Sequence, residues 1–420
     1  MKILMILENL TDRCGANVNI AIVLAKQLSK VFEVHALVRY NDMKQICFEK
    51  KETFNKVHSF YADQPEKLAR FTSNDWSKIG RLRKVIRFCK RPGIFVSMIN
   101  AKYYDFSITK KIYKNKIEEL CKKEMYDVVF AVSAPYYIMQ SVAEANISYV
   151  KMALQLDPFI NNYTLPSIFK KRRKRIENNV LSRINVLFAP DFVYKEINSF
   201  HNELNNVVLL PLPGIVVDKL NTQIQFKSWE KDYGFIHFVF VGQFYEKIRN
   251  PNYLLTLFSH LPNNYILHIV GGGCEQQLIQ YKKLLKDRLI LHGWVSKEDA
   301  DKYISQYDVL VNVNNSITNQ MPSKLFEYIG TGKPILNICK TDKCLSLPYI
   351  EKYENAISII ELDEMIPTNI VRTIEFIDSH ASNILKPKKI FERFKINTDV
   401  YVAEIIKEKI LKEGKRKKNV

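Results

Sequence analysis

The sequence has few signs of covalent cross-links or bound metal. Its seven cysteines stand at positions 14, 47, 89, 121, 274, 339 and 344, with no CxxC pair. Neither a disulfide framework nor a zinc motif is indicated, and a reducing cytoplasm fits. None of the eight histidines falls in an H-x-H or H-x3-H pattern, so His35, His58 and the others are interpreted as structural.

Long apolar runs are also missing. No run approaches the roughly 20 residues that a membrane-spanning helix needs. The first run, residues 2–7, is broken by Glu8 and is too short for a signal peptide. We therefore expect a protein that is neither exported nor membrane-spanning. Internal repeats are not visible either.

Length and composition are those of an ordinary globular protein. The chain has 420 residues, of which 47% are hydrophobic and 25% are charged. This length suits two domains of about 200 residues each.

The net charge of +19 is unevenly distributed. Residues 235–385 are close to neutral, with fourteen Lys or Arg against sixteen Asp or Glu. The basic excess concentrates in residues 78–123, in the KKRRKR run of residues 170–175, and in residues 415–418. Such an asymmetry marks a surface that meets a polyanion.

Short β-rich apolar runs alternate with helical patterns along the whole chain. The runs in the first half occupy residues 2–7, 33–38, 126–132, 147–154, 185–189 and 206–213, and those in the second half occupy residues 235–242, 265–271, 289–295, 308–314, 333–338 and 356–360. This alternation predicts two α/β domains, each a doubly wound parallel sheet. We place them at 1–215 and 235–386, with a linker at 216–234 and a charged helical tail at 387–420.

Four loops of the second domain fall at predicted strand ends. They contain Gly242 to Asn250, Gly271 to Gly273, Gly293 to Val295, and the stretch NQMPSKLFEYIGTGKPIL of residues 319–336. Ligands of open parallel sheets bind at the carboxyl ends of strands. Glycines let a backbone approach a ligand, and Lys247 and Arg249 have the charge to neutralise a diphosphate. Taken alone, the GGG run is more typical of a helix entry with no ligand, but four suitable loops at four consecutive strand ends favour a ligand site.

The stretch 319–336 has the local chemistry of half a nucleotide-sugar site. Pro322 suits the first turn of a helix that ends near Gly330. The free amides near Ser323, the helix dipole and Lys324 favour a phosphate. Glu327 lies one turn further on the same face, where it suits sugar hydroxyls. The alternative is a capped helix with a solvated glutamate.

These motifs resemble a known family. FVGQFYEKIRNP, HIVGGG, LHGWV, YDVLVNV and PSKLFEYIGTGKPI, in this order, look like the C-terminal half of GT-B glycosyltransferases, specifically the large retaining family 4 of capsule, O-antigen and exopolysaccharide pathways. The first half agrees more weakly. The resemblance implies two Rossmann-like domains that face each other across a cleft, with the donor bound by the second domain and the acceptor by the first.

The resemblance also implies roles for individual residues. Glu327 would bind the donor ribose, amides around Pro322, Ser323 and Lys324 would hold the diphosphate, and Arg249 would be the cation that stabilises it. The remaining donor contacts would come from Gly242, Lys247, Gly271, Gly272, Gly293, Trp294 and Val295, the last three at the base. Because such groups stabilise the leaving diphosphate, we expect no cofactor and no required metal.

Three positions depart from the family pattern. Asn319 stands eight residues before Glu327, where the family often has its first glutamate, and it cannot act as a carboxylate base. Gln243 follows Gly242 where an arginine is common. Asp157 stands where many members have a histidine. We predict Asp157, Asn319 and Arg249 as catalytic residues and Gly15 and Asp157 as acceptor contacts, although Asp157 suits a turn cap before Pro158 equally well.

A rival metal motif is present in Asp299-Ala300-Asp301. Other glycosyltransferases, of a different fold, use an Asp-x-Asp string for a metal-bound nucleotide sugar. Here Ser296 precedes it as a helix cap, and acids favour the first turn of a helix. We therefore interpret both aspartates as helix-start residues and predict no metal site.

The basic segments admit two interpretations. In residues 77–93 the apolar residues share one helical face and the basic residues spread over the other, which is typical of a helix in a membrane interface. The alternative is a helix packed on its own domain with a solvated basic face. No nucleic-acid recognition module accompanies KKRRKR, so we expect no specific nucleic acid. An anionic membrane that carries a lipid-linked acceptor explains the restriction of the charge to the first half.

The sequence therefore predicts a glycosyltransferase that is cytoplasmic and peripherally attached to the inner face of the cell membrane. It would transfer a sugar from a nucleotide-sugar donor to a lipid-linked glycan acceptor in cell-surface polysaccharide synthesis. One alternative is a nucleotide-sugar epimerase of the same fold. The other is a non-catalytic sugar-nucleotide-binding partner in glycan assembly.

Overall fold

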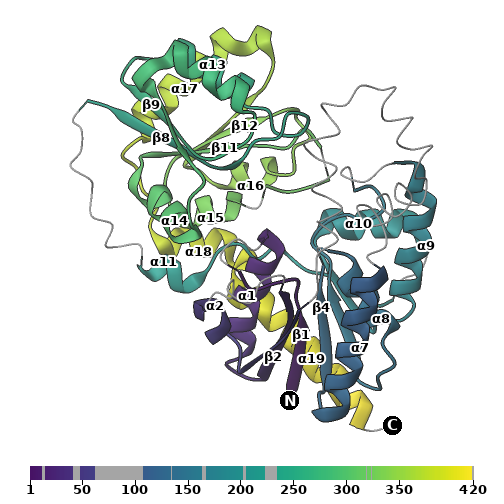
Figure 1. Cartoon of the computed structure of the whole chain (residues 1–420). Helices are drawn as coiled ribbons and strands as arrows, with labels where there is room; N and C mark the ends of the chain where they lie inside the picture. Colours follow the sequence, from purple (N-terminus) through teal and green to yellow (C-terminus); the bar gives the residue numbers. More distant parts are fainter. Residues whose placement is uncertain are drawn as a thin grey trace. The chain divides into compact units, whose positions relative to one another are not determined.

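The computed structural model describes residues 1–11, 15–40, 48–61, 107–133, 135–162, 167–201, 205–222, 234–317, 319–322 and 324–418. Their contacts divide the chain into two compact units. Unit 1 contains Met1–Pro211 and Ala403–Val420, and unit 2 contains Leu212–Val402. Figure 1 shows one sheet in each unit.

The sheet of unit 1 has seven strands in the order β3-β2-β1-β4-β5-β6-β7. They are β1 (Lys2–Ile6), β2 (Glu33–Tyr40), β3 (Lys56–Tyr61), β4 (Val128–Val132), β5 (Val150–Leu154), β6 (Val186–Ala189) and β7 (Val207–Leu209). Every pairing is parallel. The strand order reverses between β1 and β4, which makes their carboxyl ends the switch point of a Rossmann-like sheet.

Helices connect these strands. They are α1 (Ala16–Leu28), α2 (Phe48–Glu52), α7 (Ser107–Lys123), α8 (Tyr137–Glu144), α9 (Lys170–Leu181), α10 (Asp191–Phe200) and the 3-10 turn Ser167–Phe169, with α19 (Asp399–Lys418) ending in this unit. Buried side chains of α7 to α10 share one core with β1, β4, β5 and β6. Figure 1 shows α1 on one side of the sheet and α7 and α8 on the other, as right-handed crossovers require.

The sheet of unit 2 repeats this plan with six strands in the order β10-β9-β8-β11-β12-β13. They are β8 (Ile236–Gln243), β9 (Tyr265–Gly272), β10 (Leu289–Gly293), β11 (Val309–Val313), β12 (Ile335–Cys339) and β13 (Ala356–Ile360). All pairings are again parallel. The switch point lies between β8 and β11.

Two buried clusters sandwich this sheet. One is formed with α12 (Asn252–His260), α13 (Glu275–Leu285) and α17 (Ile366–His380). The other is formed with α11 (Val217–Thr222), α14 (Lys297–Gln306), α15 (Lys324–Thr331), α16 (Leu347–Lys352) and α18 (Pro387–Phe394). The 3-10 turns Lys286–Arg288, Asp363–Met365 and Lys395–Asn397 complete the unit. Helices therefore cover both faces, which is the doubly wound arrangement.

The predicted fold class is confirmed. The six apolar runs of the second half coincide with β8 to β13, and those of the first half coincide with every strand of unit 1 except β3. The sequence of β3, KVHSFY, mixes polar and apolar residues and contains no strong apolar run. Edge position explains this pattern, because β2 is the one neighbour of β3 among the strands that the structure describes.

The unit boundaries differ from the predicted domain limits at the end of the chain. Residues 387–402 pack with unit 2, where Ile390 and Phe394 are buried in the cluster that includes Phe326. Residues 403–420 belong to unit 1, where the end of α19 lies close to Met1. Most of the predicted linker, residues 223–233, lies outside the described residues.

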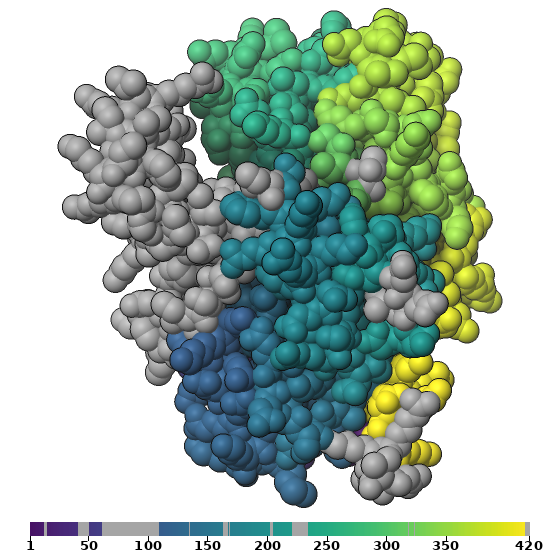
Figure 2. Space-filling model, turned by 90° about the vertical axis from the view of Figure 1, so that its right-hand side faces the viewer, coloured from purple at the N-terminus to yellow at the C-terminus, as the bar shows by residue number. Residues whose placement is uncertain are grey.

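The basic run KKRRKR forms the first half of α9 and is not uniformly exposed. Lys170, Lys171, Arg172, Lys174 and Arg175 are exposed, whereas Arg173 is only 2% exposed and its Nε donates to the carbonyl of Ile160 at 2.7 Å. Arg173 is therefore a core residue and not part of a basic surface. Figure 2 faces the side of unit 1 formed by residues 107–211, coloured blue to teal.

The predicted basic helix of residues 77–93 lies outside the described residues. Within the described part of the chain, no helix is both long enough and apolar enough to cross a membrane.

Candidate functional site

The switch point of unit 2 brings two loops together. Arg249 follows β8, and Asn315 follows β11. The Arg249 guanidinium donates from Nε and Nη2 to Asn315 Oδ1 at 3.2 and 2.9 Å. Asn315 Nδ2 in turn donates to the carbonyl of Gln320 at 3.3 Å. The predicted diphosphate cation is therefore held in place at the edge where a parallel sheet binds its ligand.

Backbone contacts fix the same loops. The amide of Ser316 donates to the carbonyl of Ile248 at 2.6 Å, and its hydroxyl donates to the carbonyl of Lys247 at 2.9 Å. A Cβ placed on Gly242 would lie 3.7 Å from Arg249 Nη1. The predicted residues Gly242, Lys247 and Arg249 thus share one edge, and the Lys247 side chain is exposed there.

The predicted helix at residues 322–330 is α15, which starts at Lys324. Leu325, Phe326, Tyr328 and Ile329 are buried, and the Tyr328 hydroxyl accepts the Val241 amide of β8 at 3.1 Å. This packing orients α15 against the sheet and leaves Glu327 partly exposed, at 34% of its side chain. Ser323 lies outside the described residues.

Two lysines contact the carboxylate of Glu327. Lys324 Nζ lies 2.7 Å from Oε2, and Lys297 Nζ, from the first turn of α14, lies 2.8 Å from the same oxygen. Glu327 Oε1 accepts no hydrogen bond from the residues that the structure describes. Oε2 thus pairs with both lysines, and Oε1 is available to accept a hydrogen bond from a ligand hydroxyl.

Glu327, Lys324 and Lys297 form a triad in which each charge affects the ionisation of the others. Burial opposes ionisation of Glu327, but the adjacent ammonium groups of Lys324 and Lys297 outweigh it and lower the pKa of the carboxyl to about 2. Burial lowers the pKa of Lys324. For Lys297, Glu327 and Asp301 outweigh burial and raise its pKa. Glu327 is therefore a carboxylate at neutral pH, and the triad carries a net positive charge.

The glycines of β9 have a clear packing role. Gly271 has a φ of +127°, and a Cβ there would lie 1.8 Å from the carbonyl oxygen of Gly242. A Cβ on Gly272 would lie 2.9 Å from Trp294 Nε1. Because Gly271 has no side chain, β8 can approach β9 closely. Because Gly272 has none either, the indole of Trp294 can lie over the backbone of β9. Trp294 remains 63% exposed and offers a flat apolar face at the strand edge.

The other predicted donor and catalytic residues of unit 2 occupy the same loops. Gly293 ends β10, with a φ of +70°, and Val295 packs against the cluster that includes Val270. Pro322 is buried just before α15, and Asn319 is partly buried between β11 and α15.

In unit 1, Asp157 also sits at the switch point. It follows β5, and its Oδ2 accepts Asn17 Nδ2 at 2.8 Å. The same Asn17 amide lies 3.3 Å from the carbonyl of Ser133, which follows β4. Gly15, the N-cap of α1, is exposed, and a Cβ there would meet no atom within 4 Å. The ends of β4 and β5 and the start of α1 therefore meet beside Asp157, where the backbone at Gly15 is open.

Buried polar residues support the Asp157 loop. Gln155 Nε2 donates to the carbonyl of Asp157 at 3.3 Å and to Glu177 Oε1 at 3.2 Å. Glu177 is fully buried, and its other oxygen lies 3.0 Å from His201 Nε2. This chain of contacts fixes the backbone of the loop from within the core.

Asp299 and Asp301 have lysine partners. Asp299 pairs with Lys302 at 2.8 Å, and its amide donates to the hydroxyl of Ser296 at 3.0 Å. Asp301 pairs with Lys297 at 2.6 Å and with Lys219 at 2.9 Å. Both aspartates therefore act in helix capping and ion pairs here, and the expectation that no metal is required stays a prediction.

Three site residues were missed by sequence reasoning: Lys297, Asn315 and Asn17. Lys297 lies in the acidic string SKEDAD, thirty positions before Glu327, so no sequence motif links the two residues. Asn315 follows β11 closely, so its position at a strand end was the signal that identifies it, whereas Asn17 is the second residue of α1. All of the site assignments remain predictions, because no ligand contact tests them.

Comparison with known proteins agrees with this geometry. Residues 236–341 match the family model described as Glycosyl transferases group 1. No curated protein matches the sequence significantly. Among solved structures, the chain is similar to Anabaena HepE in complex with UDP-glucose, with 13% identity, a TM-score of 0.63, and 98% and 100% of the two chains covered.

Two further similar structures differ in their stated activity. The lipopolysaccharide outer core galactosyltransferase WaaB has 13% identity, a TM-score of 0.57, and 98% and 100% coverage. A putative UDP-N-acetylglucosamine 2-epimerase from Listeria monocytogenes has 12% identity, a TM-score of 0.57, and 96% and 94% coverage. At such identities these likenesses establish the fold alone.

The two parallel-sheet units have the GT-B fold, and residues 236–341 carry the match to a glycosyltransferase domain. The matched domain, at residues 236–341, is the one described as Glycosyl transferases group 1, and it lies within unit 2.

Proposed function

We propose that unit 2 binds a nucleotide-sugar donor at the edge defined by Arg249 and Glu327. The observation that carries this proposal is the Arg249–Asn315 contact at the β8/β11 switch point, because it places a preorganised cation where a sheet of this type binds ligands. Arg249, Lys247 and Lys324 neutralise the diphosphate. The free oxygen of Glu327 accepts the ribose hydroxyls, and Trp294 packs on the base.

The transfer step uses these groups as electrostatic catalysts. Negative charge develops on the diphosphate as the glycosidic bond to the sugar breaks, and Arg249 stabilises it. Asn319 hydrogen-bonds the donor sugar, and Asp157 contacts the reacting sugar or the acceptor hydroxyl. We propose a retaining, metal-independent reaction. HepE, which the chain resembles in fold, is described in complex with UDP-glucose, so UDP-sugars are the first donors to test.

The acceptor is proposed to be a lipid-linked glycan at the cytoplasmic face of the membrane, as in cell-surface polysaccharide synthesis. The exposed residues of α9 support this part of the proposal. Lys170, Lys171, Arg172, Lys174 and Arg175 present a cationic surface on unit 1, and such a surface attracts anionic lipid.

The test is donor turnover with and without a membrane lipid extract. UDP-, GDP-, ADP- and CMP-sugars are first screened for thermal stabilisation of the chain, and the stabilising donor is then supplied with a labelled sugar. We expect label to appear in the lipid fraction. Replacing Arg249 by Met should lower kcat by about 10² to 10³ fold. Asn315→Ala should have a smaller effect, since it only releases Arg249 from its position.

The two alternatives give different outcomes. An epimerase changes the donor sugar in the absence of acceptor and labels no lipid, and the fold likeness to the Listeria protein makes this comparison necessary. A non-catalytic partner binds the donor and consumes none. Either outcome would contradict the proposed transfer.

A further inference from the structure

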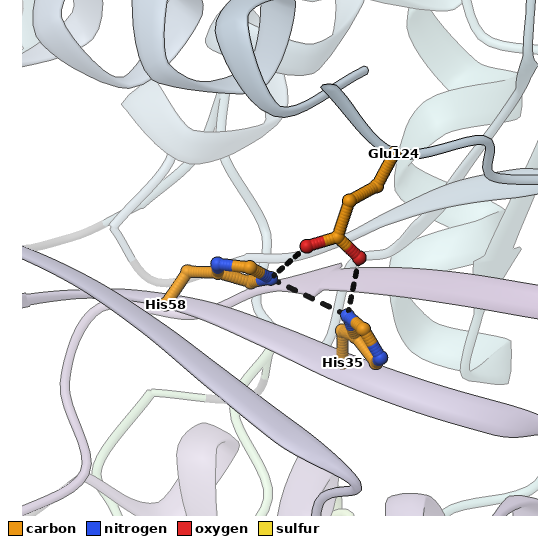
Figure 3. Close-up of side chains that lie close together, drawn as sticks. All are labelled: His35, His58 and Glu124. Carbon is orange, nitrogen blue, oxygen red and sulfur yellow. Dashed lines mark hydrogen bonds and ion pairs between the residues drawn. The ribbon is translucent and has the colours of Figure 1, made fainter. Parts of the chain in front are cut away.

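A cluster of metal-ligand side chains lies at the opposite end of the unit 1 sheet from Asp157. His35 is the third residue of β2, His58 is the third residue of β3, and Glu124 and Tyr126 lie between α7 and β4. Figure 3 shows the imidazoles of His35 and His58 and the carboxylate of Glu124 pointing toward one another. This end of the sheet is where the strands begin, so the cluster is separate from the predicted acceptor site.

The four side chains offer donor atoms at closely similar separations. His35 Nδ1 lies 3.3 Å from His58 Nε2 and 3.4 Å from Glu124 Oε2, and His58 Nε2 lies 3.6 Å from Glu124 Oε1. The hydroxyl of Tyr126 lies 3.1 Å from His35 Nδ1, 3.3 Å from His58 Nε2 and 3.4 Å from Glu124 Oε2.

These separations are those of a small tetrahedron. A tetrahedral zinc ion with bonds of about 2.0 to 2.1 Å has ligand atoms about 3.3 Å apart. The nitrogen and oxygen atoms of the cluster therefore need little movement to surround such an ion. Imidazole nitrogen with carboxylate oxygen is a ligand set that suits Zn²⁺ and its neighbours better than Mg²⁺ or Ca²⁺.

The contact of His35 on the side of its ring that faces away from the cluster also favours metal binding. His35 Nε2 lies 2.8 Å from Glu33 Oε1, and a carboxylate only accepts, so Nε2 carries the hydrogen. In the neutral ring the lone pair is then on Nδ1, which faces the cluster. A metal-bound histidine commonly has such a carboxylate on its second nitrogen.

Two lysines oppose a cation here. Lys2 and Lys56 contact Glu124 at 2.6 and 2.5 Å. Lys56 is 52% exposed, so its ammonium can move into solvent, and Lys2 lies 3.4 Å from the alternative partner Glu33. The lysines therefore weaken metal binding without blocking it sterically.

We propose that His35, His58 and Glu124 form a binding site for a zinc-class divalent ion, with Tyr126 at the fourth corner. The ion would join β2, β3 and the α7–β4 connection, and its effect would be on the stability of unit 1. His58 and Glu124 are 14% and 19% exposed, which gives the ion a path from solvent.

The test is a titration of the full-length chain, without an affinity tag and after EDTA dialysis, with Co²⁺. Four-coordinate Co²⁺ has an intense visible absorption that six-coordinate Co²⁺ lacks. We expect this absorption to saturate at one ion per chain and to disappear when Zn²⁺ displaces Co²⁺. Zn²⁺ should also raise the melting temperature, because it binds only the folded state. Mg²⁺ should do neither.

Single substitutions test which side chains bind the ion. His58→Gln and Glu124→Gln should abolish the absorption, whereas His237→Gln should retain it. His237 is the control because it also contacts a second histidine, with its Nδ1 2.9 Å from His268 Nε2 in unit 2. Lys56→Gln keeps every ligand and removes one opposing charge, so it should bind Co²⁺ roughly tenfold more tightly.

Three results would overturn the proposal. The first is no four-coordinate absorption with the wild-type chain. The second is an absorption that survives His58→Gln in a folded variant, as judged by circular dichroism. The third is unchanged affinity in Lys56→Gln, which would mean that the ion binds elsewhere.

Discussion

Lys297 Nζ lies 2.8 Å from Glu327 Oε2, although thirty positions separate the two residues. The contact joins the first turn of α14 to the first turn of α15. It gives Glu327 a second cation besides Lys324, so the carboxylate is oriented before any ligand arrives. A preorganised acceptor has less side-chain freedom to lose on binding.

We expect Glu327→Ala to weaken donor binding without unfolding the protein. The lost hydrogen bond to a charged group is worth about 1.5 to 3 kcal/mol, or roughly tenfold to a hundredfold in affinity. The loss should be seen with a ribonucleotide and be absent with the 2′,3′-dideoxy analogue, because only the first offers ribose hydroxyls. Calorimetric titration of both ligands measures it. Equal losses for the two ligands would remove ribose binding from Glu327.

The same carboxylate should contribute a pH-dependent part of stability. Its pKa is about 2 in the folded chain, below the ordinary value of 4.5. A lowered pKa means that the contribution is present above about pH 4.5 and is lost as the pH falls toward 2. The stability difference between wild type and Glu327→Gln should therefore shrink over this range. Urea unfolding at several pH values measures it, with the exposed Glu298→Gln as control. A difference that stays constant would contradict the ion pairs.

The fold was largely predictable because a buried strand can be recognised from a short run of apolar residues that are neighbours in the sequence. Residues 333–338 read as an apolar run between turn residues, and residues 335–338 of this run lie in β12. Contacts between distant positions are not encoded in this way. Lys297 reads as part of a capped helix start, and its pairing with Glu327 follows only from the packing of α14 beside α15. His35, His58 and Glu124 likewise fit no spacing motif, since three different elements bring them together.

Chelation should leave transfer activity largely intact. The proposed diphosphate ligands are Arg249, Lys247, Lys324 and backbone amides, and none of these depends on a metal. Complete loss of transfer in EDTA, with recovery in Mn²⁺, would instead support Asp299 and Asp301 as metal ligands. A lower melting temperature in EDTA with unchanged transfer is the result expected if a zinc-class ion binds unit 1.

Asp157→Asn should lower transfer while leaving donor affinity unchanged. The substitution removes the negative charge beside Asn17, but the amide still accepts the Asn17 hydrogen bond, so the loop should keep its conformation. We expect at least about a tenfold loss of kcat/KM for the acceptor if Asp157 contacts the reacting groups. Asp191→Asn, an exposed residue of α10, is the control. Normal transfer by Asp157→Asn would favour the turn-cap interpretation.

Binding to anionic liposomes should depend on the exposed cations of α9. Each Lys or Arg near such a surface contributes about 1 kcal/mol, and the attraction falls off within a Debye length. Binding should therefore require anionic lipid and weaken steeply with salt. The variant replaces Lys170, Lys171, Lys174 and Arg175 by Gln and keeps Arg173, because Arg173 packs in the core.

This fourfold variant should lose up to about 4 kcal/mol of membrane affinity. Its donor affinity should not change, because the donor is assigned to unit 2. The matched control removes the same charge from exposed positions of unit 2, by replacing Lys283, Lys286, Lys343 and Lys388 with Gln. Cosedimentation with liposomes separates the two variants. If the α9 variant still sediments and the control does not, the membrane-binding surface lies on unit 2. If the α9 variant loses donor binding as well, the assignment of donor and membrane binding to different units is wrong.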